Sequence, residues 1–299
     1  MNRLEQVLAD TSTGKHSDLA IVVPAFNEVG AIADTIRQLR EMIANHGLDA
    51  SIVVVDDGST DGTGDAASKS GSHTIRCPSN LGYGHALKIG IAASASDYVV
   101  IIDADGTYPV SAIPTMLEQA RGHDMIVGNR GEAMTGVPLI RKPAKWILNN
   151  LANTLAKREI PDLNSGLRVM RRSSLQRFIQ LLPDGFSFTT TITLCMICSG
   201  LSVVYHPIVY GKRVGHSKIR PTDFFRFMLL VVRIIMLFHP LRVFMPIGLG
   251  LFVVGIGKTI YDIYIGNLSE SAIFALLAAV MIWSLGLIAD MISRLHLRA

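Results

Sequence analysis

The sequence predicts an α/β domain, with a mostly parallel sheet and helices on both faces, followed by a C-terminal hairpin of two transmembrane helices. β-Branched apolar runs alternate with helical patterns over roughly the first 220 residues, whereas Leu, Ile, Val, Phe and Met dominate from Phe224 to Ala299. With 49% hydrophobic residues, the 299-residue chain is more apolar than one soluble domain requires. We therefore expect an N-terminal extension at 1–18, an α/β domain at 19–220, an amphipathic juxtamembrane segment at 221–242, and the transmembrane hairpin with a cytoplasmic tail at 243–299.

Four apolar runs are predicted to be buried strands, and they begin at Leu19, Ser51, Asp97 and Asp124. The first run is expected to end at Pro24. The segments 29–43 and 87–95 have the pattern of helices, the first with apolar residues at three- and four-residue spacing. Strands that alternate with helices favour a parallel, doubly wound sheet, in which ligands bind beyond the carboxyl ends of the strands.

The C-terminal hairpin is predicted from two apolar spans, Met245 to about Tyr264 and Ser271 to about Ala289, each near the ~20 residues that cross a bilayer. The preceding segment, 224–238, is interrupted by arginines and is typical of an amphipathic helix in the headgroup plane. Arginines flank the spans, but the GNLSES loop between them has none. The positive-inside rule therefore predicts a multi-pass membrane protein with its α/β domain on the cytoplasmic side. Lys258 lies inside the first span. Three explanations stay open: it is a functional ligand, its side chain snorkels to the membrane surface, or it is buried between helices.

Charge and cysteine content exclude some classes of function. The net charge is +4, but the basic residues gather around the apolar tail, which favours a membrane surface over nucleic acid. The N-terminal residues 1–18 hold no apolar run, so we expect no secretory signal. Three cysteines are too few for a disulfide framework, and Cys195 and Cys198 lack partners for a zinc site, so both are expected to be core thiols.

The most informative spacing is Asp103-Ala104-Asp105 at the end of the third run. Alternate residues of an extended chain point the same way, so two carboxylates can share one hard cation. A divalent ion held there could neutralise a diphosphate. The alternative is that both acids are solvated loop residues.

Two other strand ends carry polar motifs, PAFNE at 24–28 and DDGSTDGT at 56–63, which should lie side by side at the carboxyl edge of the sheet. There Pro24 and Phe26 could flank a flat base, and Asp57 could accept its N–H groups or ribose hydroxyls. A plain turn is the alternative, because D-G and S-T-D-G form turns in any protein. NLGYGHALKIG at 80–90 resembles a phosphate cradle, but it lacks the Lys-Ser/Thr ending of a P-loop and the spacing of a dinucleotide fingerprint.

The ordered set VVPAFNE, VVDDGSTDGT, NLGYGHAL, IIDADGTYP, VGNR, DLNSGLR and GKRVGHSK resembles family 2 glycosyltransferases, and most closely the dolichyl-phosphate mannose synthase and polyprenyl-phosphate glycosyltransferase branch. The resemblance covers roughly residues 20–218. It implies a GT-A fold, which is Rossmann-like, and a metal-dependent hexosyltransferase. Its partners would be a nucleotide-sugar donor linked to GDP or UDP, a polyprenyl or dolichyl phosphate acceptor, membrane lipid, a divalent metal (Mg or Mn), and a second copy of the chain in a homo-oligomer, with no nucleic acid.

The resemblance also implies roles for particular residues. The nucleotide-binding set would be Pro24, Phe26, Glu28, Asp57, Asp103 and Ala104, and the metal ligands Asp103, Asp105 and Thr107. The acceptor phosphate would meet Arg130, Arg141, Arg213, Ser217 and Lys218, and the acceptor-side element would be Asp162, Ser165, Gly166 and Arg168. Asp105, Arg130 and Arg213 would be catalytic. Thr107 stands where the mannose synthases have Gln, so the sequence leaves the identity of the donor sugar open.

The chemistry agrees with the resemblance, because a polyprenyl phosphate is already an anionic nucleophile and needs no strong general base. In-line displacement would invert the anomeric centre. Two alternatives stay open: a polysaccharide synthase of the same fold, although no Q-x-x-R-W motif is found, and a non-catalytic, membrane-tethered nucleotide-binding protein.

Overall fold

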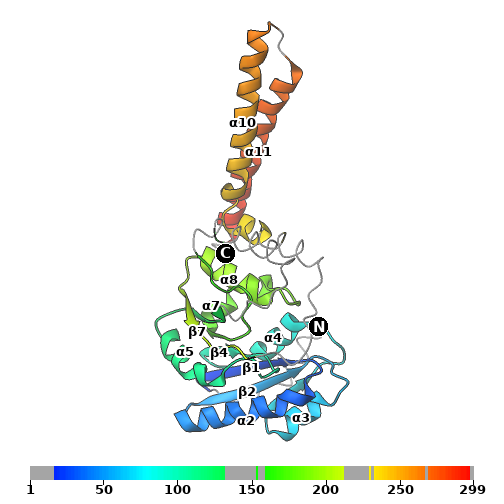
Figure 1. Cartoon of the computed structure of the whole chain (residues 1–299), viewed down its shortest axis with the longest axis vertical. Helices are drawn as coiled ribbons and strands as arrows, with labels where there is room; N and C mark the ends of the chain where they lie inside the picture. Colours follow the sequence, from blue (N-terminus) through cyan, green and yellow to red (C-terminus); the bar gives the residue numbers. More distant parts are fainter. Residues whose placement is uncertain are drawn as a thin grey trace. The chain divides into compact units, whose positions relative to one another are not determined.

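The computed structural model describes residues 17–131, 153, 159–211, 229, 232–266 and 269–296. The chain divides into two compact units, one with the sheet and its helices and one with the long C-terminal helices (Figure 1).

In the described residues the first unit contains one seven-stranded sheet with the order β3-β2-β1-β4-β6-β5-β7. The strands are β1 (Leu19–Ala25), β2 (Ala50–Asp56), β3 (His73–Arg76), β4 (Tyr98–Ile101), β5 (Met125–Asn129), β6 (Arg168–Arg171) and β7 (Val203–Pro207). Neighbouring strands are parallel except at β6, which runs antiparallel to both β4 and β5. The mostly parallel sheet is therefore confirmed, with one inserted antiparallel strand.

The predicted end of the first strand at Pro24 is wrong, because β1 continues to Ala25 and pairs Pro24 with Val55 of β2. Proline has no N–H to donate to a neighbouring strand. Val22 O accepts the N–H of Ile102 on the β4 side, and Ala25 O accepts the N–H of Asp57 on the β2 side. The main-chain nitrogen of Pro24 therefore points toward β4, like the main chain of Val22. The pairing between β1 and β4 has already ended at Val22, so the missing N–H of Pro24 costs the sheet no hydrogen bond.

Helices cover both faces of the sheet, as predicted. They are α2 (Val29–His46), α3 (Thr63–Lys69), α4 (Tyr83–Ala92), α5 (Ile113–Ala120), α7 (Arg172–Gln176) and α8 (Phe188–Cys198), with 3-10 turns η1 (Val110–Ala112) and η4 (Ile179–Leu181). The helix predicted at 87–95 begins four residues earlier, at Tyr83, directly after the Gly-rich loop. Cys195 and Cys198 of α8 are free and buried, which confirms that they are core thiols.

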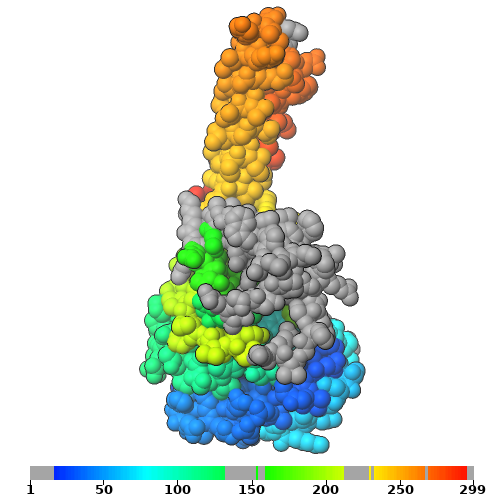
Figure 2. Space-filling view, viewed as in Figure 1, coloured from blue at the N-terminus to red at the C-terminus, as the bar shows by residue number. Residues whose placement is uncertain are grey.

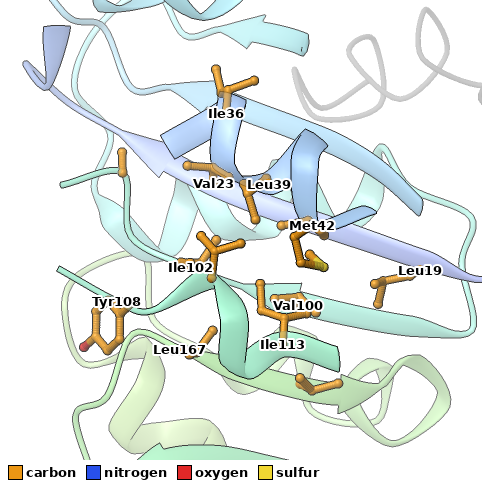
Figure 3. Packing of buried hydrophobic residues seen from close by; sticks show 14 of the residues in the cluster. Leu19, Val23, Ile36, Leu39, Met42, Val100, Ile102, Tyr108, Ile113 and Leu167 are labelled. Carbon is orange, nitrogen blue, oxygen red and sulfur yellow. The ribbon is translucent and has the colours of Figure 1, made fainter. Parts of the chain in front are cut away.

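The main core lies between the sheet and the face covered by α2 and α5. Figure 3 shows Leu39 and Met42 of α2 close to Val23 and Val100 of the strands, and Ile36 and Ile113 belong to the same buried cluster. These side chains are buried, and each is worth about 1.5–3 kcal/mol of transfer free energy. On the opposite face, a Cβ on Gly90 of α4 would lie 2.4 Å from a Val22 methyl. Glycine therefore lets α4 lie close against β1, and the packing fixes the edge of the sheet from which the site residues project.

The second unit is a hairpin of α10 (Leu241–Tyr264) and α11 (Glu270–His296), which lie side by side in Figure 2. Both helices are long and apolar enough to cross a membrane. Small residues allow their close packing, since a Cβ on Gly248 or Gly255 would collide with Trp283 or Leu276.

A polar cluster fixes the turn between the two helices. Asp262 is 1% exposed and accepts hydrogen bonds from the Ser269 N–H (2.9 Å) and hydroxyl, just before α11 begins. Lys258 Nζ lies 3.4 Å from Asp262 Oδ1, so the lysine inside the first span has an acidic partner on its own helix. Before the hairpin, residues 232–238 are helical, with Arg233 exposed and Ile235 buried, as an amphipathic helix requires. Most of the predicted segment 224–231 lies outside the described residues.

Candidate active site

The loops after β1 and β2 lie side by side at the carboxyl edge of the sheet, as predicted. The Asn27 N–H donates to Ser59 Oγ (2.9 Å), and Asn27 Oδ1 accepts from the Thr60 N–H (2.9 Å). The Glu28 N–H donates to Thr63 Oγ1 (2.8 Å). Asn27 has a φ of 56°, a left-handed conformation that Asn tolerates better than most residues. These three hydrogen bonds hold the two loops together at the carboxyl edge of the sheet.

Asp57 lies buried beneath the Gly-rich loop that leads into α4. Its Oδ1 accepts from the Leu81 N–H (2.9 Å) and its Oδ2 from the Gly82 N–H (2.8 Å). The carboxylate therefore holds this loop in place, and its contact with a nucleoside stays a prediction. Pro24 is buried in β1, while Phe26 and Glu28 are partly exposed at the edge.

Asp103 follows β4 and is held between two neighbouring segments. The Tyr83 hydroxyl donates to Asp103 Oδ1 (2.8 Å). On its other side, a Cβ on Gly166 would lie 2.3 Å from Asp103 Oδ2, so only glycine lets the 162–166 loop pass this close. Burial raises the pKa of the Tyr83 phenol well above its ordinary value, and the charge of Asp103 raises it further.

Asp105 is oriented by the residue two positions later. Its Oδ1 accepts from the Thr107 hydroxyl (2.6 Å) and N–H (3.1 Å). Thr107 is 3% exposed, and its carbonyl accepts the N–H of Gly211 (2.8 Å). Thr107 thus supports Asp105, and its direct coordination to a metal stays a prediction. Ala104, between the acids, is buried, and its carbonyl accepts from the Thr35 hydroxyl (3.2 Å).

The donor set at Asp103 and Asp105 fits a hard divalent cation that is shared with a ligand. Carboxylate oxygens suit Mg²⁺ or Mn²⁺, and Mg²⁺ sites commonly combine one or two carboxylates with water and substrate phosphates. The described residues contain no group of three or more His, Cys, Asp or Glu that could hold a metal ion. A pair of acids therefore fits a metal that diphosphate oxygens help to bind.

Arg130 and Asp162, predicted as separate acceptor-side residues, form one two-pronged ion pair. Arg130 Nε donates to Asp162 Oδ2 and Nη2 to Oδ1, both at 2.8 Å, and the guanidinium lies over the Tyr210 ring at 5.4 Å. Burial alone would raise the pKa of Asp162, but hydrogen bonds from Arg130 and the Asn164 N–H outweigh it and hold the pKa below its ordinary value. Burial likewise opposes the charge on Arg130, yet the pair keeps its pKa above the usual range.

Arg168 shapes the acceptor-side loop from beneath, because its side chain is fully buried. Nε donates to Ser165 O (2.8 Å), Nη2 to Leu163 O (2.9 Å) and Nη1 to Thr193 Oγ1 (2.6 Å). Burial lowers the pKa of this guanidinium. The Gly166 N–H donates to the Tyr108 hydroxyl (2.7 Å), which ties the loop to the segment after Asp105.

The structure thus brings Asp103, Asp105, the Gly-rich loop and the D-x-x-S-G-x-R element together at one edge. Sequence reasoning missed Tyr83 and Tyr108; the signal for Tyr83 was a phenol inside a Gly-rich loop, and for Tyr108 a phenol three residues after Asp105. Four of the predicted acceptor residues, Arg141, Arg213, Ser217 and Lys218, lie outside the described residues.

Comparison with known proteins agrees with this arrangement. The family model for glycosyl transferase family 2 matches residues 20–179, and that for the GtrB C-terminal hairpin matches residues 239–295. The hairpin match and the two long apolar helices indicate membrane association.

Three curated relatives illustrate the similarity. The low-salt glycan biosynthesis hexosyltransferase Agl6 of Haloferax volcanii is 27% identical over 84% of this chain, which spans only 61% of that relative's length. The undecaprenyl-phosphate mannosyltransferase of Micrococcus luteus is 29% identical over 66% of this chain and 85% of its own. The bactoprenol glucosyl transferase of Shigella phage SfV is 29% identical over 94% and 95% of the two chains.

A solved structure shares the fold. The crystal structure of glucosyl-3-phosphoglycerate synthase from Mycobacterium tuberculosis, in complex with Mn²⁺, UDP and glucosyl-3-phosphoglycerate, superposes with a TM-score of 0.56 at 20% identity, covering 79% of this chain and 83% of that one. This likeness confirms the GT-A fold of the first unit. Because the family model covers more than half of the 299 residues, the chain belongs to glycosyl transferase family 2.

Proposed function

We propose that this protein is an inverting hexosyltransferase that moves a hexose from a GDP- or UDP-linked donor to a polyprenyl or dolichyl phosphate, with Mg²⁺ or Mn²⁺. The observation that carries the proposal is the placement of Asp103 and Asp105 directly after β4, which lies between β1 and β6 in the sheet, with Asp103 held between Tyr83 and Gly166. The names of the relatives from Micrococcus luteus and Shigella phage SfV support the acceptor class. The Mn²⁺ and UDP named with the Mycobacterium tuberculosis structure support the donor class and the metal.

On the donor side, each residue contributes binding or orientation. Pro24 and Phe26 would flank the base, Glu28 and Asp57 would lie near the nucleoside, and Asp103 and Asp105 would hold the metal. When bound, the metal supplies positive charge that stabilises the leaving nucleoside diphosphate. Thr107 keeps Asp105 in one orientation through two hydrogen bonds. A carboxylate held in this way needs little reorganisation when the donor binds.

On the acceptor side, a second anion must reach the anomeric carbon next to a diphosphate. We propose that Arg130, Arg141 and Arg213, with Ser217 and Lys218, offset this repulsion. Arg130 uses Nε and Nη2 to bond Asp162, so Nη1 is the guanidinium nitrogen that could meet the phosphate. Arg168 would act indirectly, by holding the carbonyls of Leu163 and Ser165 and thus the shape of the loop. The phosphate oxygen then attacks without a strong general base.

The hairpin would tether the first unit to the membrane that contains the lipid substrate. We propose that both ends of the hairpin and the catalytic unit face the cytosol, because arginines flank the spans and are absent from the GNLSES loop. Assembly into a homo-oligomer stays a prediction from the resemblance.

The test is transfer by the full-length protein in detergent, with a pool of GDP-mannose, UDP-glucose and UDP-N-acetylglucosamine. We expect one sugar to be transferred, only when polyprenyl phosphate is present, and mass spectrometry of the lipid to identify it. Retention of the α configuration in the product would contradict inversion. A long polymer would instead support a polysaccharide synthase, and no turnover with retained nucleotide binding would support a non-catalytic protein.

A further inference from the structure

Tyr83, the first residue of α4 directly after the Gly-rich loop, has a contact that none of the proposed roles uses. Its hydroxyl donates to Asp103 Oδ1 at 2.8 Å. Asp103 is therefore bounded by this phenol at one oxygen and by the backbone of Gly166 at the other. A carboxylate held on both sides has one orientation rather than several.

The ring of Tyr83 is itself held by the 183–187 loop, which packs on the start of α4. Phe186 stacks on Tyr83, with ring centroids 5.7 Å apart and an interplanar angle of 10°. The His85 N–H donates to Asp184 O (3.0 Å), and Lys88 Nζ lies 2.8 Å from Asp184 Oδ1. A Cβ on Gly84 would lie 2.1 Å from Pro183 O, so the loop and the helix can approach this closely only at a glycine.

Resting on the function proposed above, we propose that Tyr83 is a positioning residue that orients Asp103 toward the divalent metal, and that the 183–187 loop fixes Tyr83 for this role. A residue that hydrogen-bonds a metal ligand fixes its geometry, and removal of such a partner typically weakens metal binding about 10- to 100-fold. A residue that only packs would lack this effect, because phenylalanine preserves the ring and its stacking.

The experiment measures Mn²⁺ binding to the full-length protein by electron paramagnetic resonance. Mn²⁺ is titrated into the protein once in the presence of GDP and once in the presence of UDP. Tyr83→Phe should weaken Mn²⁺ binding about 10- to 100-fold while the melting temperature stays unchanged. Tyr98→Phe is the matched control, because Tyr98 begins the same strand, β4, at its opposite end. Phe186→Ala should cause a smaller loss in the same direction, since it frees the ring but keeps the hydroxyl.

The outcomes separate this inference from the proposed function. If the wild type binds Mn²⁺ and Asp105→Asn does not, but Tyr83→Phe binds like the wild type, the role of Tyr83 is wrong and the metal site stands. If the wild type binds no Mn²⁺ with either nucleotide, the Mn²⁺ site and the role of Tyr83 both fail, whereas the proposed function fails only if transfer to polyprenyl phosphate is also absent. With saturating metal, transfer by Tyr83→Phe should approach the wild-type rate, whereas a rate that stays low at every Mn²⁺ concentration would contradict a role in metal positioning.

Discussion

At the scale of single residues, the site is held by buried charges that have partners. The side chains of Arg130 and Asp162 are only 13% and 2% exposed, and they satisfy each other with two parallel hydrogen bonds. Loss of one member leaves the other charged and buried without a partner, which lowers the stability of the fold strongly. Replacement of both members by apolar residues of the same volume would change the stability far less. The exposed pair of Arg76 and Asp65 is the opposite case, since water solvates both groups.

Asp162→Asn should therefore lower the stability of the first unit by about 3–5 kcal/mol, because Arg130 keeps its charge without a carboxylate. Asp65→Asn, the control, should cost about 1 kcal/mol or less. The pKa of Asp162 is lower in the folded protein than in the unfolded chain, where it is about 3.9. The ion pair therefore contributes its full stability above the unfolded-state pKa, and this contribution is lost as the pH falls through the lower pKa of the folded state. Thermal unfolding should show a constant difference between wild type and Asp162→Asn from pH 8 to pH 5. A difference that disappears within that range would contradict the assignment.

Asp105→Asn tests the metal at the same scale. The carboxylate lies at a strand end and contributes little to the core, so folding should persist while metal-dependent transfer falls by more than about 100-fold. Asp103→Asn should act in the same direction. Asp49→Asn is the control, because Asp49 is an exposed acid just before β2, at the other edge of the sheet. Undiminished wild-type transfer in EDTA would show that the acids hold no catalytic metal.

At the scale of elements, the sequence predicts what periodicity encodes and misses what depends on pairing over long distances. The strands β1, β2, β4 and β5 are predicted from their apolar runs, and α2 is predicted from its three- and four-residue apolar spacing. The strands β3, β6 and β7 are as short as β4 and β5, but they contain polar residues such as His73 and Arg168, so no apolar run marks them. Likewise the Asp103–Asp105 spacing is local and was predicted, whereas Arg130 and Asp162 meet across 32 residues, which only the fold brings together.

Gly166→Ala tests the close approach of the 162–166 loop to the metal acids. The added Cβ would lie 2.3 Å from Asp103 Oδ2, so either the loop or the carboxylate must move. We expect weaker Mn²⁺ binding and slower transfer with a largely retained fold, measured by metal titration and circular dichroism. Gly122→Ala is the control, because its Cβ would meet only Gln119 O, at 3.9 Å. Equal metal affinity in both variants would mean that the loop adapts without disturbing Asp103.

In the hairpin, Asp262→Ala should loosen the turn, because Asp262 accepts both the N–H and the hydroxyl of Ser269 before α11 begins. The expected result is a lower melting temperature of the hairpin in detergent. Asp290→Ala, which removes an i,i+4 pair with Arg294, whose side chain is 72% exposed, should change that temperature much less. If the two variants melt alike, the cluster at the turn contributes no stability.

At the scale of the whole molecule, the two units differ in the side chains that they expose. The residues proposed to bind the donor and the metal all belong to the first unit, whereas α10 and α11 expose large apolar side chains such as Val253, Ile260 and Met281. In water such a surface would drive association, and in a bilayer it meets lipid. The sequence predicted this division from composition alone, because the apolar excess is confined to the C-terminal part.

The orientation of the hairpin gives the last prediction, in which the GNLSES segment between the two spans faces away from the cytosol. Asn267→Cys should react with a membrane-impermeant maleimide in intact cells, because the arginines that flank the spans hold both ends inside. Glu118→Cys, on the exposed side of α5, should react only after lysis.

The background should be low, because Cys77, Cys195 and Cys198 are buried, and burial raises the pKa of Cys77 to about 11 and that of Cys195 to about 12. Few thiolates then form at neutral pH, and the thiolate is the reactive species. Labelling of Glu118→Cys but not Asn267→Cys in intact cells would reverse the topology and place the proposed active site outside the cytosol.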